Sequence, residues 1–140
     1  MKIAIVSGYF NPLHVGHLDY MEAAKELADK LIVIVNSDYQ VTLKGSTPFM
    51  REEDRIRIIK SLKVVDKVYL SIDKDRSVSK TIQLKFYELN NEFELYFANG
   101  GDQDNSSILE SNVCNELNIK MIDGLGSKIQ SSSWLLNTDL

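Results

Sequence analysis

The sequence predicts a single α/β domain built on a doubly wound parallel sheet of five strands. Five short apolar runs alternate with longer amphipathic stretches along the 140 residues. The clearest runs are continuous and rich in β-branched residues, as expected of strands that are covered on both faces. In the stretches between the runs, apolar residues recur every three or four positions, which is typical of helices with one buried side. This alternation implies right-handed crossovers and helices on both faces of the sheet.

Each strand is predicted from a short apolar run. The first two runs, Ile3–Val6 and Leu31–Val35, contain no polar residue. The other three runs place strands at Val68–Leu70, Leu95–Ala98 and Lys120–Ile122.

The helices are predicted from the 3.6-residue period of their apolar positions. In the first helix, for example, Leu18, Met21 and Ala24 fall on one side. The pattern places helices at Gly16–Leu27, Arg51–Leu62, Ser77–Leu89 and Ile108–Leu117, and a terminal helix at Ser131–Leu136.

Four loops are the expected place of the functional site. In sheets of this kind, ligands bind outside the carboxyl ends of the strands, where the strand order reverses. The loops at those ends are Ser7–His14, Asn36–Met50, Asn99–Asn105 and Asp123–Ser131. The chain shows no internal repeat, linker or low-complexity stretch, so we expect residues 1–140 to form one domain.

The composition indicates which partners and which cellular compartment to expect for this protein. The formal net charge is −4, which gives no support for a basic surface that would bind nucleic acid. Cys114 is the only cysteine, so it forms no disulfide within the chain, and we expect it to be a small buried hydrophobe. No apolar run approaches the ~20 residues that a membrane span needs. We therefore expect a cytoplasmic protein without a membrane segment.

The strongest functional signal follows the first strand, where the sequence from Gly8 reads GYFNPLHVGH. Gly8 would allow a sharp turn, and Gly16 would let a ligand approach the start of the helix. His14 and His17 are three residues apart, so both rings should face the same side there. Free N–H groups and the positive end of the helix dipole attract phosphate at such a position.

The chemistry that fits this pair is phosphoryl transfer. Two imidazoles that donate N–H to the oxygens around an α-phosphate would stabilise the charge of its transition state. No covalent nucleophile is needed if the phosphate of the acceptor attacks. One alternative is a purely structural histidine pair. Another is a His-x-x-His metal site, but no further histidine and no neighbouring cysteine or carboxylate completes it.

The segment Gly8–His17 resembles the G-x-F-D-x-x-H-x-G-H signature of the cytidylyltransferase-like nucleotidylyltransferases. Their small members include glycerol-3-phosphate cytidylyltransferases and heptose-1-phosphate adenylyltransferases. The resemblance continues in the same order along nearly the whole chain. It implies a Rossmann-like sheet of order 3-2-1-4-5, a homodimer, and a nucleotide site lined by Gly8, Tyr9, Phe10 and Gly16. Triphosphate chemistry also implies a divalent cation, Mg²⁺.

The loop after the second strand and the helix that follows it resemble further motifs of this family. The match implies that Lys44 contacts the triphosphate, although a solvated surface lysine is the alternative. Asp38 would orient the loop or contact the acceptor. Arg55 falls in the E-x-R element, which implies a grip on a phosphate of the acceptor or the nucleotide. An ion pair with Glu52 is the alternative for Arg55.

Two later segments resemble the remaining parts of a nucleotide site. Gly101 and Asp102 match a G-G-D element that lines the nucleoside pocket, although an ordinary Asp turn is the alternative. The three serines that start at Ser131 are good N-cap residues and good donors to a phosphate. The resemblance implies that nucleotide contacts come from Lys128, Gln130, Ser131 and Ser132.

These signals predict an enzyme that transfers a nucleoside monophosphate from CTP or ATP to a polyol or sugar phosphate and releases pyrophosphate. CTP is slightly favoured, and an ATP-dependent adenylyltransferase acting on a heptose-1-phosphate-like sugar is the first alternative. A nucleotide-binding regulatory module without turnover is the second. The segment His14–His17 is also similar to the H-I-G-H signature of aminoacyl-tRNA synthetases, but the chain is short, acidic and without a K-M-S-K-S-like loop.

Overall fold

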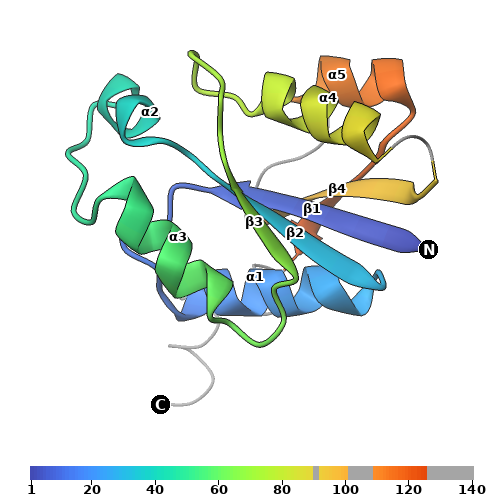
Figure 1. Ribbon diagram of the computed structural model, residues 1–140, viewed down its shortest axis with the longest axis horizontal. Coiled ribbons are helices and arrows are strands. Elements are labelled where there is room, and N and C mark those ends of the chain that lie inside the picture. The colour runs from blue at the N-terminus through green and yellow to red at the C-terminus, as the bar shows by residue number, and fades with distance from the viewer. Residues whose placement is uncertain (90–91, 101–108, 126–140) are drawn as a thin grey trace.

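The computed structural model describes residues 1–89, 92–100 and 109–125 (Figure 1). They form one sheet of five parallel strands, as the sequence predicts. Its spatial order is β3-β2-β1-β4-β5, which confirms the order 3-2-1-4-5 implied by the family resemblance. The strands are β1 (Lys2–Gly8), β2 (Lys30–Val35), β3 (Lys67–Leu70), β4 (Glu94–Gly100) and β5 (Lys120–Leu125).

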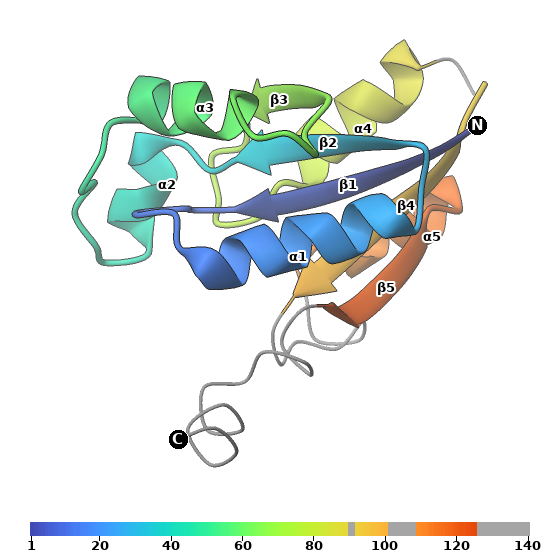
Figure 2. The same cartoon turned by 90° about the horizontal axis from the view of Figure 1, so that it is seen from below.

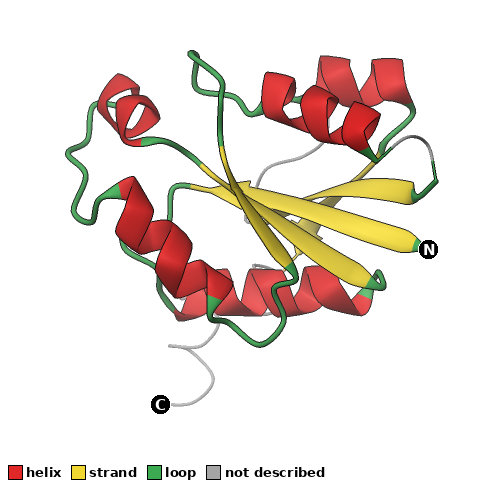
Figure 3. Ribbon diagram, viewed as in Figure 1, coloured by secondary structure: helices red, strands yellow, loops and turns green. Residues whose placement is uncertain are grey.

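Helices cover both faces of the sheet (Figures 1 and 2). On one face lie α1 (Val15–Glu26) and α3 (Glu52–Lys60), and on the other lie α4 (Ser79–Glu88) and α5 (Ser111–Leu117). Figure 3 shows the strands as a single layer between these two pairs.

Two hydrophobic cores result, one on each face. Successive side chains of a strand point to opposite sides, so Ile3 and Ile5 pack with Ile82 of α4, whereas Ala4 and Val6 pack with Met21 of α1. Burial on both faces explains why the first two strands are continuous apolar runs in the sequence.

Cys114 is buried in the core under α5, as predicted. Burial raises the pKa of its thiol to about 12, so the side chain packs as a neutral hydrophobe. Among the residues that the structure describes, no helix is long and apolar enough to cross a membrane.

One predicted loop is wrong, because Asn36–Met50 contains the short helix α2 (Asp38–Leu43). Ser37 Oγ accepts the N–H of Gln40, and the Gln40 side chain accepts the N–H of Ser37. This reciprocal pair is a capping box, and the Ser-x-x-Gln spacing was the sequence signal for it. The other predicted helices are present with shifted ends, and the helix predicted at Ser131–Leu136 lies outside the described residues.

Candidate active site

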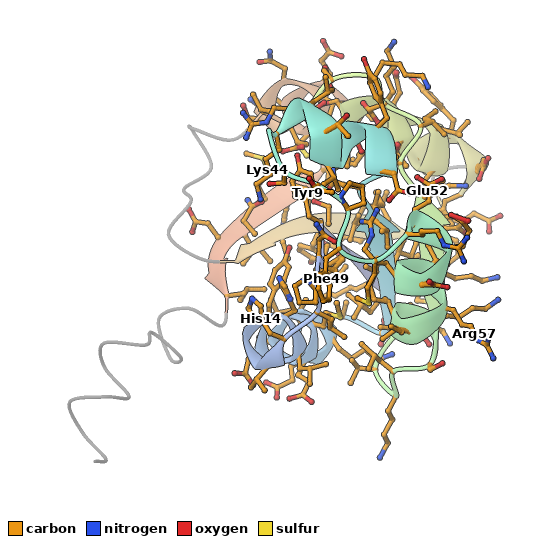
Figure 4. The ribbon with its side chains drawn as sticks, turned by 90° about the vertical axis from the view of Figure 1, so that its left-hand side faces the viewer. Tyr9, His14, Lys44, Phe49, Glu52 and Arg57 are labelled. Carbon is orange, nitrogen blue, oxygen red and sulfur yellow. The ribbon has the colours of Figure 1, made fainter. Side chains whose placement is uncertain are left out.

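The strand order reverses next to the central strand β1, and this creates a crevice at its carboxyl end. From β1 the chain proceeds outward to β2 and β3, and it then returns to place β4 on the other side of β1. The helices that follow β1 and β4 therefore lie on opposite faces, which leaves room for a ligand between the two strand ends. Figure 4 looks onto this end of the molecule, where Tyr9, His14 and Lys44 lie.

His14 and His17 form a stacked pair at the start of α1. Their ring centroids are 3.8 Å apart, with 27° between the ring planes. His14 is the N-cap residue, and its Nδ1 accepts the N–H of Gly16 at 3.1 Å. His17 Nδ1 accepts the N–H of His14 at 3.0 Å. The prediction that the two rings share one side of the helix start is confirmed.

These two hydrogen bonds fix where each ring carries its proton. A ring nitrogen that accepts a hydrogen bond from a backbone N–H has no proton of its own, so the proton of the neutral ring is on Nε2. Both histidines thus have Nε2–H as the donor that remains for a ligand. The backbone at the start of α1 selects this tautomer.

His17 is held in its neutral form. Its ring is half-buried and meets the edge of the Phe10 ring, with 4.9 Å between the centroids. Burial, together with the charge of neighbouring His14, lowers the pKa of His17 from 6.5 to about 4. At neutral pH, His17 is therefore a hydrogen-bond donor without a net charge.

This lowered pKa predicts a loss of stability in acid. Between pH 6.5 and about 4, His17 takes up a proton in the unfolded chain but not in the folded protein. The stability that this group contributes is complete above pH 6.5 and is lost as the pH falls. In urea titrations at several pH values, the wild-type protein should lose more stability on acidification than a His17→Gln variant. Parallel pH profiles for the two proteins would contradict the prediction.

The loop before α1 is shaped by Phe10. The sharp turn expected at Gly8 lies instead at Phe10, whose φ is 49°. Phe10 is buried and supports His17 from the core side, so its ring is not exposed to a ligand. A Cβ on Gly8 would lie 2.7 Å from the Phe10 ring, and one on Gly16 would lie 3.0 Å from the His14 ring. The two glycines make room for these rings.

Arg55 is buried and binds the protein itself. Its Nη1 donates to the carbonyls of Tyr9 and Asn36, both at 2.7 Å, and its Nε donates to the carbonyl of Met50 at 3.1 Å. Its Nη2 donates to Asp38 Oδ1 at 2.6 Å. Four of the five guanidinium N–H groups are thus used within the protein. Arg55 ties together the segments that follow β1 and β2, which corrects the expected grip on a phosphate.

Asp38 and Glu52 form further contacts in the link that Arg55 makes between the two loops. The predicted alternative, an ion pair between Arg55 and Glu52, is replaced by the pair between Arg55 and Asp38. Glu52 instead accepts the N–H of Asp38 at 2.7 Å. Of the two roles expected for Asp38, orienting the loop is the one that its contacts support.

Lys44 lies at the carboxyl end of α2, on the same end of the molecule as His14 (Figure 4). Its Nζ is 4.4 Å from the centroid of the Tyr9 ring. The side chain of Lys44 is otherwise exposed and has no ion pair among the described residues. The structure therefore places Lys44 against Tyr9, at the same end of the molecule as His14.

Asn11 is a site residue that the sequence reasoning missed. Its Nδ2 donates to the carbonyl of Thr47 at 3.0 Å, and its Oδ1 accepts the N–H groups of Phe49 and Met50. Asn11 thereby joins the loop after β1 to the segment that leads into α3. Its position inside the signature, where the family has aspartate, was the available signal.

The remaining expected contacts lie outside the described residues. They are those of Gly101, Asp102, Lys128, Gln130, Ser131 and Ser132. At the described end of β4, Tyr20 of α1 donates its hydroxyl proton to the carbonyl of Ala98. A Cβ on Gly100 would lie 2.9 Å from the Tyr20 ring, so Gly100 allows α1 to pack against this strand end.

Comparison with known proteins agrees with this geometry. The chain is similar to the bifunctional protein HldE of Aliarcobacter butzleri, with 35% identity over 127 residues that cover 88% of this chain and 25% of that protein. It is also similar to the FAD synthase of Thermococcus kodakarensis, with 42% identity over 67 residues that cover 47% of this chain and 45% of the enzyme. The chain thus spans a quarter to less than half of these two relatives.

One solved structure is similar to this chain over most of both chains. It is the lipopolysaccharide core biosynthesis protein from Thermoplasma volcanium GSS1, with a TM-score of 0.68 and 26% identity over 88% of this chain and 95% of that one. The model of the cytidylyltransferase-like family matches residues 5–123. Because this match covers most of the chain, with the histidine pair and at least part of each strand, the chain belongs to the cytidylyltransferase-like family of nucleotidyltransferases.

Proposed function

We propose that this protein transfers a nucleoside monophosphate from a nucleoside triphosphate to a phosphorylated small molecule and releases pyrophosphate. The stacked pair of His14 and His17 carries this proposal, because the backbone leaves both Nε2–H groups as donors. Lys44 adds a positive charge at the same end of the sheet.

In the proposed reaction, a phosphate oxygen of the acceptor attacks the α-phosphorus of the nucleotide. The bond between that phosphorus and the bridging oxygen to the β-phosphate breaks, and pyrophosphate leaves with the bond's electron pair. The Nε2–H groups of the histidines donate to the oxygens on which charge accumulates. Lys44 holds the outer phosphates, so the leaving group stays in line with the attacking oxygen.

We further propose that Mg²⁺ enters with the nucleotide. The described part of the chain has no cluster of three or more His, Cys, Asp or Glu side chains that could enclose a metal ion. Mg²⁺ usually keeps several waters and binds through substrate phosphates, so the oxygens of the triphosphate suit it. When bound, it would neutralise charge on those oxygens.

ATP is the first nucleotide to test, ahead of the CTP that the sequence slightly favoured. The similarity to FAD synthases supports this order, because the product in their name contains an adenosine group. The family resemblance supports a sugar or polyol phosphate as the acceptor. A flavin phosphate belongs in the same test.

The decisive experiment is a pyrophosphate-release screen. The four common nucleoside triphosphates are each combined with Mg²⁺ and a panel of phosphorylated polyols, sugars and flavin mononucleotide. One nucleotide and acceptor pair should release pyrophosphate, and a double His14→Ala, His17→Ala variant should not. Tight nucleotide binding without release from any acceptor would favour the regulatory module instead.

A further inference from the structure

The helix α2 carries Lys44 at its end, and its contacts give this lysine a fixed place. We infer that α2 acts as an arm that positions Lys44. The Gln40 side chain anchors the first turn of this helix, and the Tyr9 ring holds the Lys44 side chain at its end. The inference rests on the proposed function, since it takes Lys44 to bind the triphosphate. It adds Gln40 and Tyr9 as positioning residues that act through Lys44.

Gln40 is fully buried, and all four hydrogen-bonding positions of its amide are used. Its Oε1 accepts from Asn36 Nδ2 and from the N–H of Ser37, both at 3.0 Å. Its Nε2 donates to the carbonyls of Asp75 and Ser77, both at 2.7 Å. Gln40 therefore joins the end of β2 to a turn more than 30 residues further along the chain.

Besides the contacts of Asp38 with Arg55 and Glu52, this anchor is the main link between α2 and the rest of the protein. The helix is six residues long, and an isolated helix of that length is unstable in water. Only Gln40 and Val41 of α2 are buried. Figure 1 shows α2 at the end of the sheet, away from the helices that cover its faces. Loss of the Gln40 contacts should therefore loosen the whole arm.

The other end of the arm packs against the loop that leads from β1 to the histidines. Lys44 ends the helix, and Gly45, with a φ of 89°, turns the chain away. The Lys44 ammonium lies over the face of the Tyr9 ring, and Arg55 holds the carbonyl of Tyr9. An aromatic face attracts an ammonium group without using its N–H donors. Lys44 thus remains able to bind phosphate while Tyr9 fixes its place relative to His14.

The test compares the Michaelis constants of the two substrates. Gln40→Met keeps the side-chain length but removes all four hydrogen bonds, and it should raise KM for the nucleotide roughly tenfold by loss of preorganisation. Tyr9→Leu should raise the same constant about threefold, as expected for an exposed cation–π contact, and Tyr9→Phe should raise it less. KM for the acceptor should stay within twofold in all three variants. Gln83→Met, at an exposed position of α4, is the matched control.

A double-mutant cycle separates positioning from a general structural effect. In a Lys44→Ala background, Gln40→Met and Tyr9→Leu should no longer raise KM for the nucleotide, because both act through Lys44. Effects that persist in full in that background would overturn the inference. If Gln40→Met fails to fold, the Tyr9→Leu variant still decides whether Tyr9 acts through Lys44.

Hydrogen exchange tests the arm without any turnover. In Gln40→Met, the amides of Val41 and Lys44 should exchange faster, whereas those in the middle of α1 should keep their protection. If no substrate pair is turned over by the wild-type protein, the proposed function fails, and this exchange pattern still decides whether α2 is anchored by Gln40. Unchanged exchange in α2 would overturn the anchor even in an active enzyme.

Discussion

Turnover should fall by ~10²-fold or more in a His17→Ala variant that keeps its fold. The substitution removes one of the two Nε2–H donors proposed to meet the transition-state charge. It also removes the acceptor of the His14 N–H, but that hydrogen bond is exposed, so water can replace the lost partner. The measurement is kcat for pyrophosphate release with the substrate pair found in the screen, together with a thermal melt.

The control for this variant is Glu22→Ala, at an exposed position on the same helix. It should leave kcat near the wild-type value, since Glu22 lies more than one turn beyond His17 along α1. Near-normal turnover in His17→Ala would remove the pair from the mechanism. A lost melting transition would show that His17 is needed for the fold, and the structural alternative for the pair would then gain support.

Replacing Arg55 by alanine should lower the free energy of unfolding by about 3–5 kcal/mol. The substitution leaves the Asp38 carboxylate without its buried partner, and it leaves the carbonyls of Tyr9 and Asn36 without donors. Urea titration monitored by circular dichroism measures the change. Arg55→Lys should recover little of it, because an ammonium cannot reproduce the spread of guanidinium donors.

Arg57 provides the matched comparison on the same helix. Its side chain is exposed and points away from the site (Figure 4). Arg57→Ala should change the free energy of unfolding by no more than about 0.5 kcal/mol. Equal effects at positions 55 and 57 would contradict the role of Arg55 as the tie between the two loops.

The sheet and the histidine pair could be predicted because each depends on residues close together in the sequence. Ile3–Val6 is apolar at every position, and that pattern is sufficient to indicate a strand with both faces buried. The spacing of His14 and His17 places both rings on one side of a helix start, whatever the rest of the chain does.

The partners of Arg55 and Gln40 could not be predicted in this way. The position of Glu52, three residues before Arg55 on the same helix, suggested an ion pair between them, but the chain brings Asp38 to Arg55 from 17 residues away. The carbonyls that hold Gln40 come from residues 35 and 37 positions later. Such contacts depend on how the loops meet at the end of the sheet, and no local pattern encodes that meeting.

The placement of protons on the two imidazoles also limits which nucleophiles this site can use. Each Nδ1 lone pair is taken by a backbone N–H, and each Nε2 already carries a hydrogen. Neither ring can abstract a proton without breaking a hydrogen bond at the start of α1. In the proposed reaction, an attacking group would therefore have to arrive already ionised. A phosphate monoester is largely ionised at neutral pH, since its second pKa is about 6, whereas an alcohol is not.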